Sequence, residues 1–156
     1  MTAPAATREA LWPWSLEVYG RPGVEPLLLE LQDAHGQCVP FLLWALWMAA
    51  RGLAADETTL AAGAAMARAW QAAAIQPLRD LRRGLKTGPS PPQRERLRTS
   101  VKSLELEAER MLLQMLGDAS PAGARGGSAR DALAAAAAAW GAAPAALLDR
   151  LAALAA

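Results

Sequence analysis

The sequence predicts an all-α fold, a compact helical bundle of about five core helices. Three observations support this prediction. The chain is 53% hydrophobic but only 5% aromatic, and much of its apolar content is alanine, the best helix former. It contains four valines and one isoleucine, so strands have little to be built from. Residues 39–51 are apolar on every side of a helix, which is typical of a buried central helix.

Two helices are expected before this central one. The first should run from about Thr7 to Tyr19, and we expect Pro13 to break it, kink it or mark its true first turn. The second should span 24–35, where apolar residues recur at intervals of three and four. Gly36 suits the left-handed position that closes a helix.

The central helix should form the middle of the core. Burial of each large apolar side chain contributes roughly 1.5–3 kcal/mol. An unpaired carboxylate at Leu46 should therefore abolish folding. The large side chains of this segment are Phe41, Leu42, Leu43, Trp44, Leu46, Trp47 and Met48.

A long helical hairpin, 57–86 and 92–116, should follow. Asp56 is the expected N-cap, with Thr59 in the first turn, and Pro77 should kink the first arm. A Pro-rich turn at 87–92 favours an antiparallel arrangement of the two arms. A stripe close to a heptad seam is expected on the second arm at Leu97, Val101, Leu104, Ala108, Met111 and Met115.

The chain is expected to divide into three parts. Residues 1–116 should form the helical bundle domain, and residues 117–127 a flexible linker. Residues 128–156 should form an Ala-rich helical appendage with few anchoring side chains. This tail is either a loosely docked helical pair split at 141–144 or a mobile appendage.

Charge and targeting signals narrow the function classes. The net charge of +1 gives no global attraction to nucleic acid or anionic membranes. The distribution is uneven, because residues 1–50 carry two basic and five acidic side chains, whereas residues 79–102 carry eight basic and two acidic ones. No signal peptide is visible, and the longest uncharged apolar run, 38–50, falls short of the roughly 20 residues that span a bilayer. We therefore expect a cytoplasmic protein without membrane contact.

Several motifs resemble those of a known family. They are Trp14-Ser-Leu-x-x-Tyr19-x-x-Pro-Gly-Val24, Leu31-Gln-Asp-x-His-Gly36-x-x-Val39, Leu43-x-x-x-Trp47 and Pro77-Leu-Arg-x-Leu-Arg-Arg-x-Leu-Lys86. Together they resemble a family of proteobacterial proteins of unknown function, each about 160 residues long. The resemblance covers roughly residues 10–115. It implies no activity, so it bears on the fold and not on the chemistry.

The segment 32–36 is the most function-like feature of the sequence. It places an amide, a carboxylate and the only histidine at a helix end, where they would orient a ligand or transfer a proton. The alternative is that Asp33 caps a helix or pairs with an arginine while His35 satisfies terminal carbonyls. The ligand-binding hypothesis comprises Gln32, Asp33, His35, Tyr19, Arg79 and Arg82, the two arginines holding an anionic group.

Catalytic and metal chemistry find little support. The single cysteine, Cys38, excludes an intramolecular disulfide, and no second His or Cys completes a metal site with His35. A cysteine at the start of an apolar helix is typical of a core residue. We therefore expect no cofactor, no metal and no catalytic residue, and lean away from an enzyme without deciding the point.

The basic segment 79–102 and the tryptophans each have two interpretations. The segment either contacts nucleic acid or is a solvated face with ion pairs to Asp33, Glu30 or Glu25. It contains no aromatic residue on which a base could stack. The tryptophans either line a pocket or pack in the core, with indole N–H groups seeking acceptors such as Gln32 or Asp33. The tryptophans concerned are Trp12, Trp14, Trp44, Trp47 and Trp70.

We therefore expect a protein-interaction or self-association module, whose contact surface is the 97–115 seam or the tail. The alternative is a binder of a small anionic ligand at the Gln32-Asp33-His35 helix end facing Arg79 and Arg82. Nucleic-acid binding through 79–102 is the weakest of the three.

Overall fold

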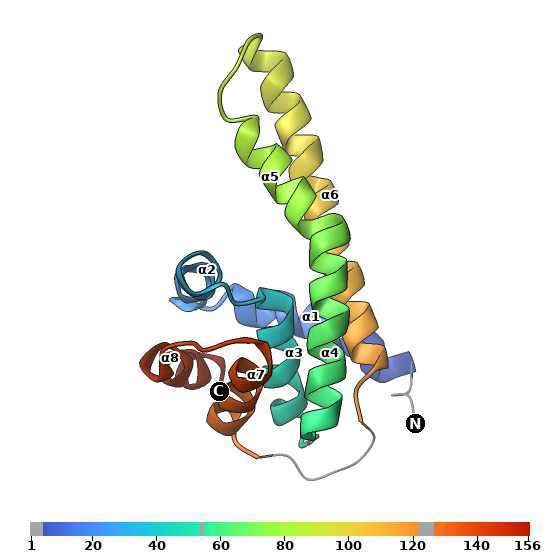
Figure 1. The fold of residues 1–156 in the computed structure, drawn as a ribbon, viewed down its shortest axis with the longest axis vertical. Helices are drawn as coiled ribbons and strands as arrows, with labels where there is room; N and C mark the ends of the chain where they lie inside the picture. The colour runs from blue at the N-terminus through green and yellow to red at the C-terminus, as the bar shows by residue number, and fades with distance from the viewer. Residues whose placement is uncertain (1–4, 54, 122–126) are drawn as a thin grey trace.

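The computed structural model describes residues 5–53, 55–121 and 127–156, which form eight α-helices and one π-helical segment (Figure 1). The all-α prediction is confirmed, and the described residues contain no strand. The α-helices are α1 (Ala5–Tyr19), α2 (Val24–His35), α3 (Val39–Ala50), α4 (Glu57–Trp70), α5 (Gln76–Gly84), α6 (Pro91–Asp118), α7 (Ala129–Trp140) and α8 (Ala145–Ala155); the π segment is Gln71–Ile75.

Helix α3 lies at the centre of the core, as predicted. Every residue from Pro40 to Met48 is buried, and Trp44 and Trp47 have no exposed surface. Helices α1, α2, α4, α6 and α7 all pack against it. An all-round apolar helix needs partners on every side, and this arrangement supplies them.

The predicted helix ends are also confirmed. The Asp56 carboxylate accepts a hydrogen bond from the Thr59 backbone N–H at 2.7 Å, which satisfies one of the free N–H groups at the start of α4. Gly36 has a φ of 63° and closes α2 by donating its N–H to the Leu31 carbonyl.

Pro13 does not break the first helix, contrary to one of the alternatives for this position. It lies inside α1, which runs unbroken to Tyr19. Its side chain is exposed, whereas Leu11, Ser15 and Val18 form the buried face. The backbone hydrogen bond that proline cannot make therefore lies on the solvent side, where water replaces it.

The hairpin has the predicted two arms, and its outer half projects beyond the rest of the molecule (Figure 1). The first arm comprises α4, the π segment and α5, and the second is α6, which ends two residues beyond the expected 116. The irregularity expected at Pro77 takes the form of the π segment, which ends two residues before it.

The fold divides the stripe expected on α6, because three of its members face solvent. Leu97, Leu104 and Met111 are 52%, 57% and 42% exposed. The buried face lies further round the helix, because a carboxylate, Glu105, is buried there by pairing with arginines of α5. The buried residues of α6 are Val101, Glu105, Ala108, Leu112, Leu113, Leu116 and Gly117.

The tail forms a helical pair that packs on the body and is split at 141–144. Helix α7 lies against α3 and α4, and α8 lies against α2 and α7. Leu133 and Leu151 are fully buried, and the Trp140 indole donates to the Gly36 carbonyl at 2.7 Å. Of the expected linker 117–127, the first two residues belong to α6 and residues 122–126 lie outside the described part.

Candidate functional site

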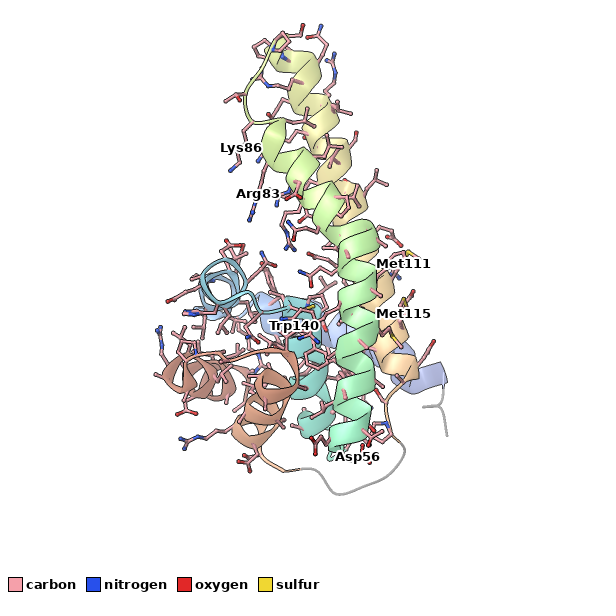
Figure 2. All side chains as sticks on the ribbon, viewed as in Figure 1. Asp56, Arg83, Lys86, Met111, Met115 and Trp140 are labelled. Carbon is pink, nitrogen blue, oxygen red and sulfur yellow. The ribbon has the colours of Figure 1, made fainter. Side chains whose placement is uncertain are left out.

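The candidate site lies where the hairpin meets the body, at the inner angle between α5, α6 and the helices α1 and α2. Two hollows adjoin there, and both are lined by Gln32 and Arg79. Figure 2 shows Arg83 and Lys86 on the side of the hairpin that faces α2. The ligand-binding hypothesis of the sequence analysis concerns the same helix end, Gln32-Asp33-His35, facing Arg79 and Arg82.

A cluster of charged side chains forms the wall between α5 and α6. Arg79 and Glu105 are only 6% and 7% exposed, and Nε of Arg79 donates to Glu105 at 3.2 Å. Arg79 also reaches Glu109 at 3.4 Å, and Nε of Arg82 donates to Glu105 at 2.5 Å. Each buried charge therefore has a partner, which burial requires.

These contacts shift the acidity of the groups involved. Although burial by itself raises the pKa of Glu105, the hydrogen bonds from Arg82 and Arg79 hold it below its usual value. Burial raises the pKa of Glu109, and the neighbouring Glu105 adds to the effect. Burial, together with Glu25 and Glu109, raises the pKa of Tyr19 to about 12, so its hydroxyl keeps its proton at neutral pH.

The larger hollow, which we call the crook groove, has a volume of about 530 Å³. Three leucines from three different helices expose apolar surface to it: Leu16 is 51% exposed, Leu29 38% and Leu106 50%. Its lining residues are Trp12, Ser15, Leu16, Tyr19, Glu25, Leu29, Gln32, Val39, Pro40, Leu43, Arg79, Arg82, Thr99, Lys102, Ser103, Glu105, Leu106, Glu109 and Leu113.

The smaller hollow, which we call the polar pocket, has a volume of about 200 Å³. Asp33 on its edge pairs with Arg83 at 3.2 Å, which links α2 to the hairpin. The buried amide oxygens of Gln37 and Gln71 have no partner among the described residues. Its lining residues are Gln32, Asp33, Gly36, Gln37, Gln71, Gln76, Arg79 and Arg83.

The structure brings most of the predicted site residues together. Gln32 and Arg79 line both hollows, Tyr19 and Arg82 line the crook groove, and Asp33 lines the polar pocket. His35 lines neither hollow, and its imidazole has no hydrogen bond or ion pair to the described residues.

The pairing of the basic segment differs in part from the expectation. Arg83 does pair with Asp33, but Arg79 and Arg82 pair with Glu105 and Glu109 of α6 rather than with Glu25 or Glu30. Glu105 and Glu109 are four residues apart, so they lie on one helical face, and the antiparallel hairpin places that face opposite α5. The sequence analysis did not name Glu105 and Glu109 as partners of the arginines, and their spacing of four residues was the signal that could have identified them.

Cys38 and two tryptophans are accounted for by the core. Cys38 is 4% exposed, and burial raises the pKa of its thiol to about 12, so it is held as a thiol. The Trp44 indole donates to Ser120 and the Trp70 indole to the Ala108 carbonyl, both at 2.8 Å, rather than to Gln32 or Asp33. Trp12 lines the crook groove.

Across residues 5–53, 55–121 and 127–156 no group of three or more His, Cys, Asp or Glu side chains is placed to hold a metal ion. None of the helices in the described part is both long enough and apolar enough to cross a membrane.

Comparison with known proteins finds a family that the chain matches. The model of a family described as "Protein of unknown function (DUF2390)" matches residues 10–116. No curated protein and no solved structure matches the chain. The matched range includes the hairpin as far as residue 116 and every residue that lines the two hollows.

Proposed function

Because the chain belongs to this family of proteins of unknown function, its own surface must indicate its role, and we propose that it is a self-associating protein-interaction module that docks through its hairpin. One observation carries the proposal. Of the seven large apolar side chains that are exposed on the described residues, five lie on the hairpin: Leu81, Leu97, Leu104, Leu106 and Met111. Clustered exposed apolar residues are typical of interaction surfaces.

Three of the five form a continuous line on the outer face of α6. Leu97, Leu104 and Met111 are spaced by seven residues, so they recur on one side of the helix. Figure 2 shows Met111 on the side of the hairpin away from α2. We call these three residues the outer seam. Ser100 and Glu107 lie between them, each three residues after a seam residue, at the second heptad position that faces this side of the helix.

A second copy of the chain fits this surface. An antiparallel pairing centred on Leu104 would place Leu97 of each copy opposite Met111 of the other, so every seam residue would meet an apolar partner. Such a pairing is self-complementary under a two-fold axis, which is the commonest symmetry of soluble oligomers. The seam spans 14 residues, or about 21 Å of helix, which is enough for two full heptads.

Sedimentation equilibrium of the wild-type chain and of Leu104→Glu tests the proposal. The wild-type chain should form a dimer at micromolar concentration, and the variant should be a monomer with unchanged helical circular dichroism, because Leu104 is 57% exposed and makes no core contact. Leu106→Glu is the matched control, since Leu106 is 50% exposed on the opposite face of α6, and it should remain a dimer. A monomeric wild-type chain at 100 µM (about 100-fold above a micromolar dissociation constant) would refute self-association.

Nucleic-acid binding has less support from the basic segment. Four of its eight basic residues are engaged with carboxylates, namely Arg79, Arg82, Arg83 and Arg98. The proposal therefore keeps the outer seam as the docking surface.

A further inference from the structure

The crook groove has the features of a ligand site that is separate from the outer seam. It lies on the other face of α6, and its volume of about 530 Å³ falls within the range of roughly 300–1,000 Å³ that small-molecule sites occupy. Leu16, Leu29 and Leu106 approach it from α1, α2 and α6, so an apolar body lying in it would be covered on three sides. These leucines otherwise expose apolar surface to water, which is unfavourable.

A buried polar group in the groove lacks a partner. Ser15 is 3% exposed and lines the groove, and its hydroxyl makes no hydrogen bond to the described residues. A serine inside a helix normally bonds a carbonyl of the preceding turn or faces water. An unpaired buried hydroxyl destabilises the folded state, so such a group in a native structure calls for a partner that the protein itself does not supply.

Three cationic side chains of the groove, Arg79, Arg82 and Lys102, carry donors that the described residues leave unused. Arg79 and Arg82 direct Nε and one terminal nitrogen toward Glu105 and Glu109, and the other terminal nitrogen of each has no acceptor among the described residues. The Lys102 ammonium on the rim also has no carboxylate partner there.

The acceptors in the groove are fewer. Both oxygens of Glu105 accept hydrogen bonds from the arginines, and Glu109 accepts one from Arg79. Glu25 is the remaining carboxylate, and it lies near the Tyr19 hydroxyl, whose proton it helps to retain. A ligand that offers acceptors to the unused donors is therefore complementary to this groove.

We propose that the crook groove binds an anionic amphiphile, a molecule with an apolar chain and a carboxylate. The three leucines cover the chain, and the unused donors of Arg79, Arg82 and the Ser15 hydroxyl hydrogen-bond the oxygens of the head group. Along α6 the groove extends from Thr99 to Leu113, about 21 Å at the rise of an α-helix, which accommodates an extended chain of about twelve carbons.

Isothermal titration calorimetry with dodecanoate, below its micelle concentration, tests the site. Dodecyltrimethylammonium has the same chain and a cationic head group, so it separates the two parts of the proposal. We expect saturable binding of one dodecanoate per chain and at least tenfold weaker binding of the ammonium compound. Equal affinity for the two head groups, or the absence of saturable dodecanoate binding, would overturn the proposal.

Variants of two exposed leucines on opposite faces of α6 show on which face dodecanoate binds. Leu106→Glu should weaken dodecanoate binding at least tenfold, whereas Leu104→Glu should leave it unchanged. Equal binding by both variants would indicate adsorption elsewhere and overturn the assignment. Since Leu104→Glu tests dimer formation and Leu106→Glu tests the groove, the failure of either proposal is recognised without reference to the other.

The Ser15 hydroxyl provides a third readout. Ser15→Ala removes only one oxygen from a buried position, so the variant should fold and be at least as stable as the wild-type chain. We expect three- to tenfold weaker dodecanoate binding, because the ligand loses a hydrogen bond. Wild-type affinity in this variant would show that the hydroxyl does not contact the ligand.

Discussion

Replacement of Gly63 by alanine examines how closely α4 packs on the central helix. Gly63 is buried inside α4, and an added Cβ would lie 2.6 Å from Cζ3 and 2.8 Å from Cη2 of Trp44. The Phe41 ring is 3.4 Å away on the same side. Real Cβ atoms essentially never approach other heavy atoms within 3.0 Å, so either the ring or the helix must move.

The Trp44 ring is poorly placed to yield. It has no exposed surface, its indole donates to Ser120 at 2.8 Å, and its ring centroid lies 5.7 Å from that of Phe41. Alanine gains about 1 kcal/mol over glycine inside a helix. Overpacking a dense core costs about 1–3 kcal/mol, and two contacts below 3.0 Å favour the upper part of that range. The net expectation for Gly63→Ala is a loss of about 1–2 kcal/mol.

Urea denaturation, followed by circular dichroism at 222 nm, measures this loss. For a chain of this length the expected loss corresponds to a fall of about 2–8 °C in melting temperature. Gly84→Ala is the matched control, since Gly84 ends α5 with nothing within 4 Å of an added Cβ, and it should be neutral or stabilising by up to about 0.5 kcal/mol. If Gly63→Ala proved as stable as the wild-type chain, the close packing against Trp44 would be disproved.

Three further predictions concern the core, the charged wall and the buried thiol. Leu46→Asp should leave the chain unfolded by circular dichroism, whereas Leu46→Ala should fold with a loss of about 2–5 kcal/mol, and a folded aspartate variant would contradict the central role of α3. Arg79→Met should lower the stability measured in urea by about 1.5–3 kcal/mol, because buried Glu105 loses one of its two arginine partners and keeps Arg82. The double replacement with Glu105→Met should recover part of this loss, and independent, additive effects would contradict the pairing. Folding raises the pKa of the Cys38 thiol from 9.0 to about 12. The contribution of this thiol to the free energy of unfolding is therefore fully present below pH 9. It should decline between pH 9 and 12, by up to about 1.4 kcal/mol per pH unit. Cys38→Ala should make the decline in urea-measured stability shallower, and an unchanged slope would argue against a buried, protonated thiol.

Local patterns predicted the parts of the fold that depend on neighbouring residues. The all-round apolar segment marked α3, the Asp56 and Thr59 pair marked the start of α4, and Gly36 marked the end of α2. Each signal needs only a few consecutive residues, because helix caps and helix faces are set within one or two turns.

Features that depend on distant partners were not predictable in the same way. The apolar residues of α6 suggested a face through Leu104, yet the buried face includes Glu105, which is stable there because Arg79 lies 26 residues earlier on the opposite arm. Apolar patterning cannot anticipate a buried ion pair. The docking of Trp140 on Gly36 joins residues 104 apart, beyond any local pattern.

The meeting of some of the predicted residues was foreseeable from the sequence, but their pairing was not. The residues near the start of α3 and those of α5 do meet, and Arg83 pairs with Asp33. The two other arginines were assigned to an anionic ligand, but Glu105 and Glu109 partly occupy them. The orphaned hydroxyl of Ser15 has no signal in the sequence, because burial and partners are properties of the fold alone.

The π segment has a consequence for how this chain tolerates changes in length. In a regular α-helix Arg79 would lie about 120° around the axis from Ala67, twelve residues earlier. Both residues are nevertheless buried, because the wide π turn takes up the rotation about the helix axis that one residue of a regular α-helix would add. The first arm is in effect an α-helix with one inserted residue. Deleting one alanine from 72–74 should therefore restore a regular helix and keep Arg79 opposite Glu105, whereas a deletion in α5 before Arg79 would rotate the arginine out of register.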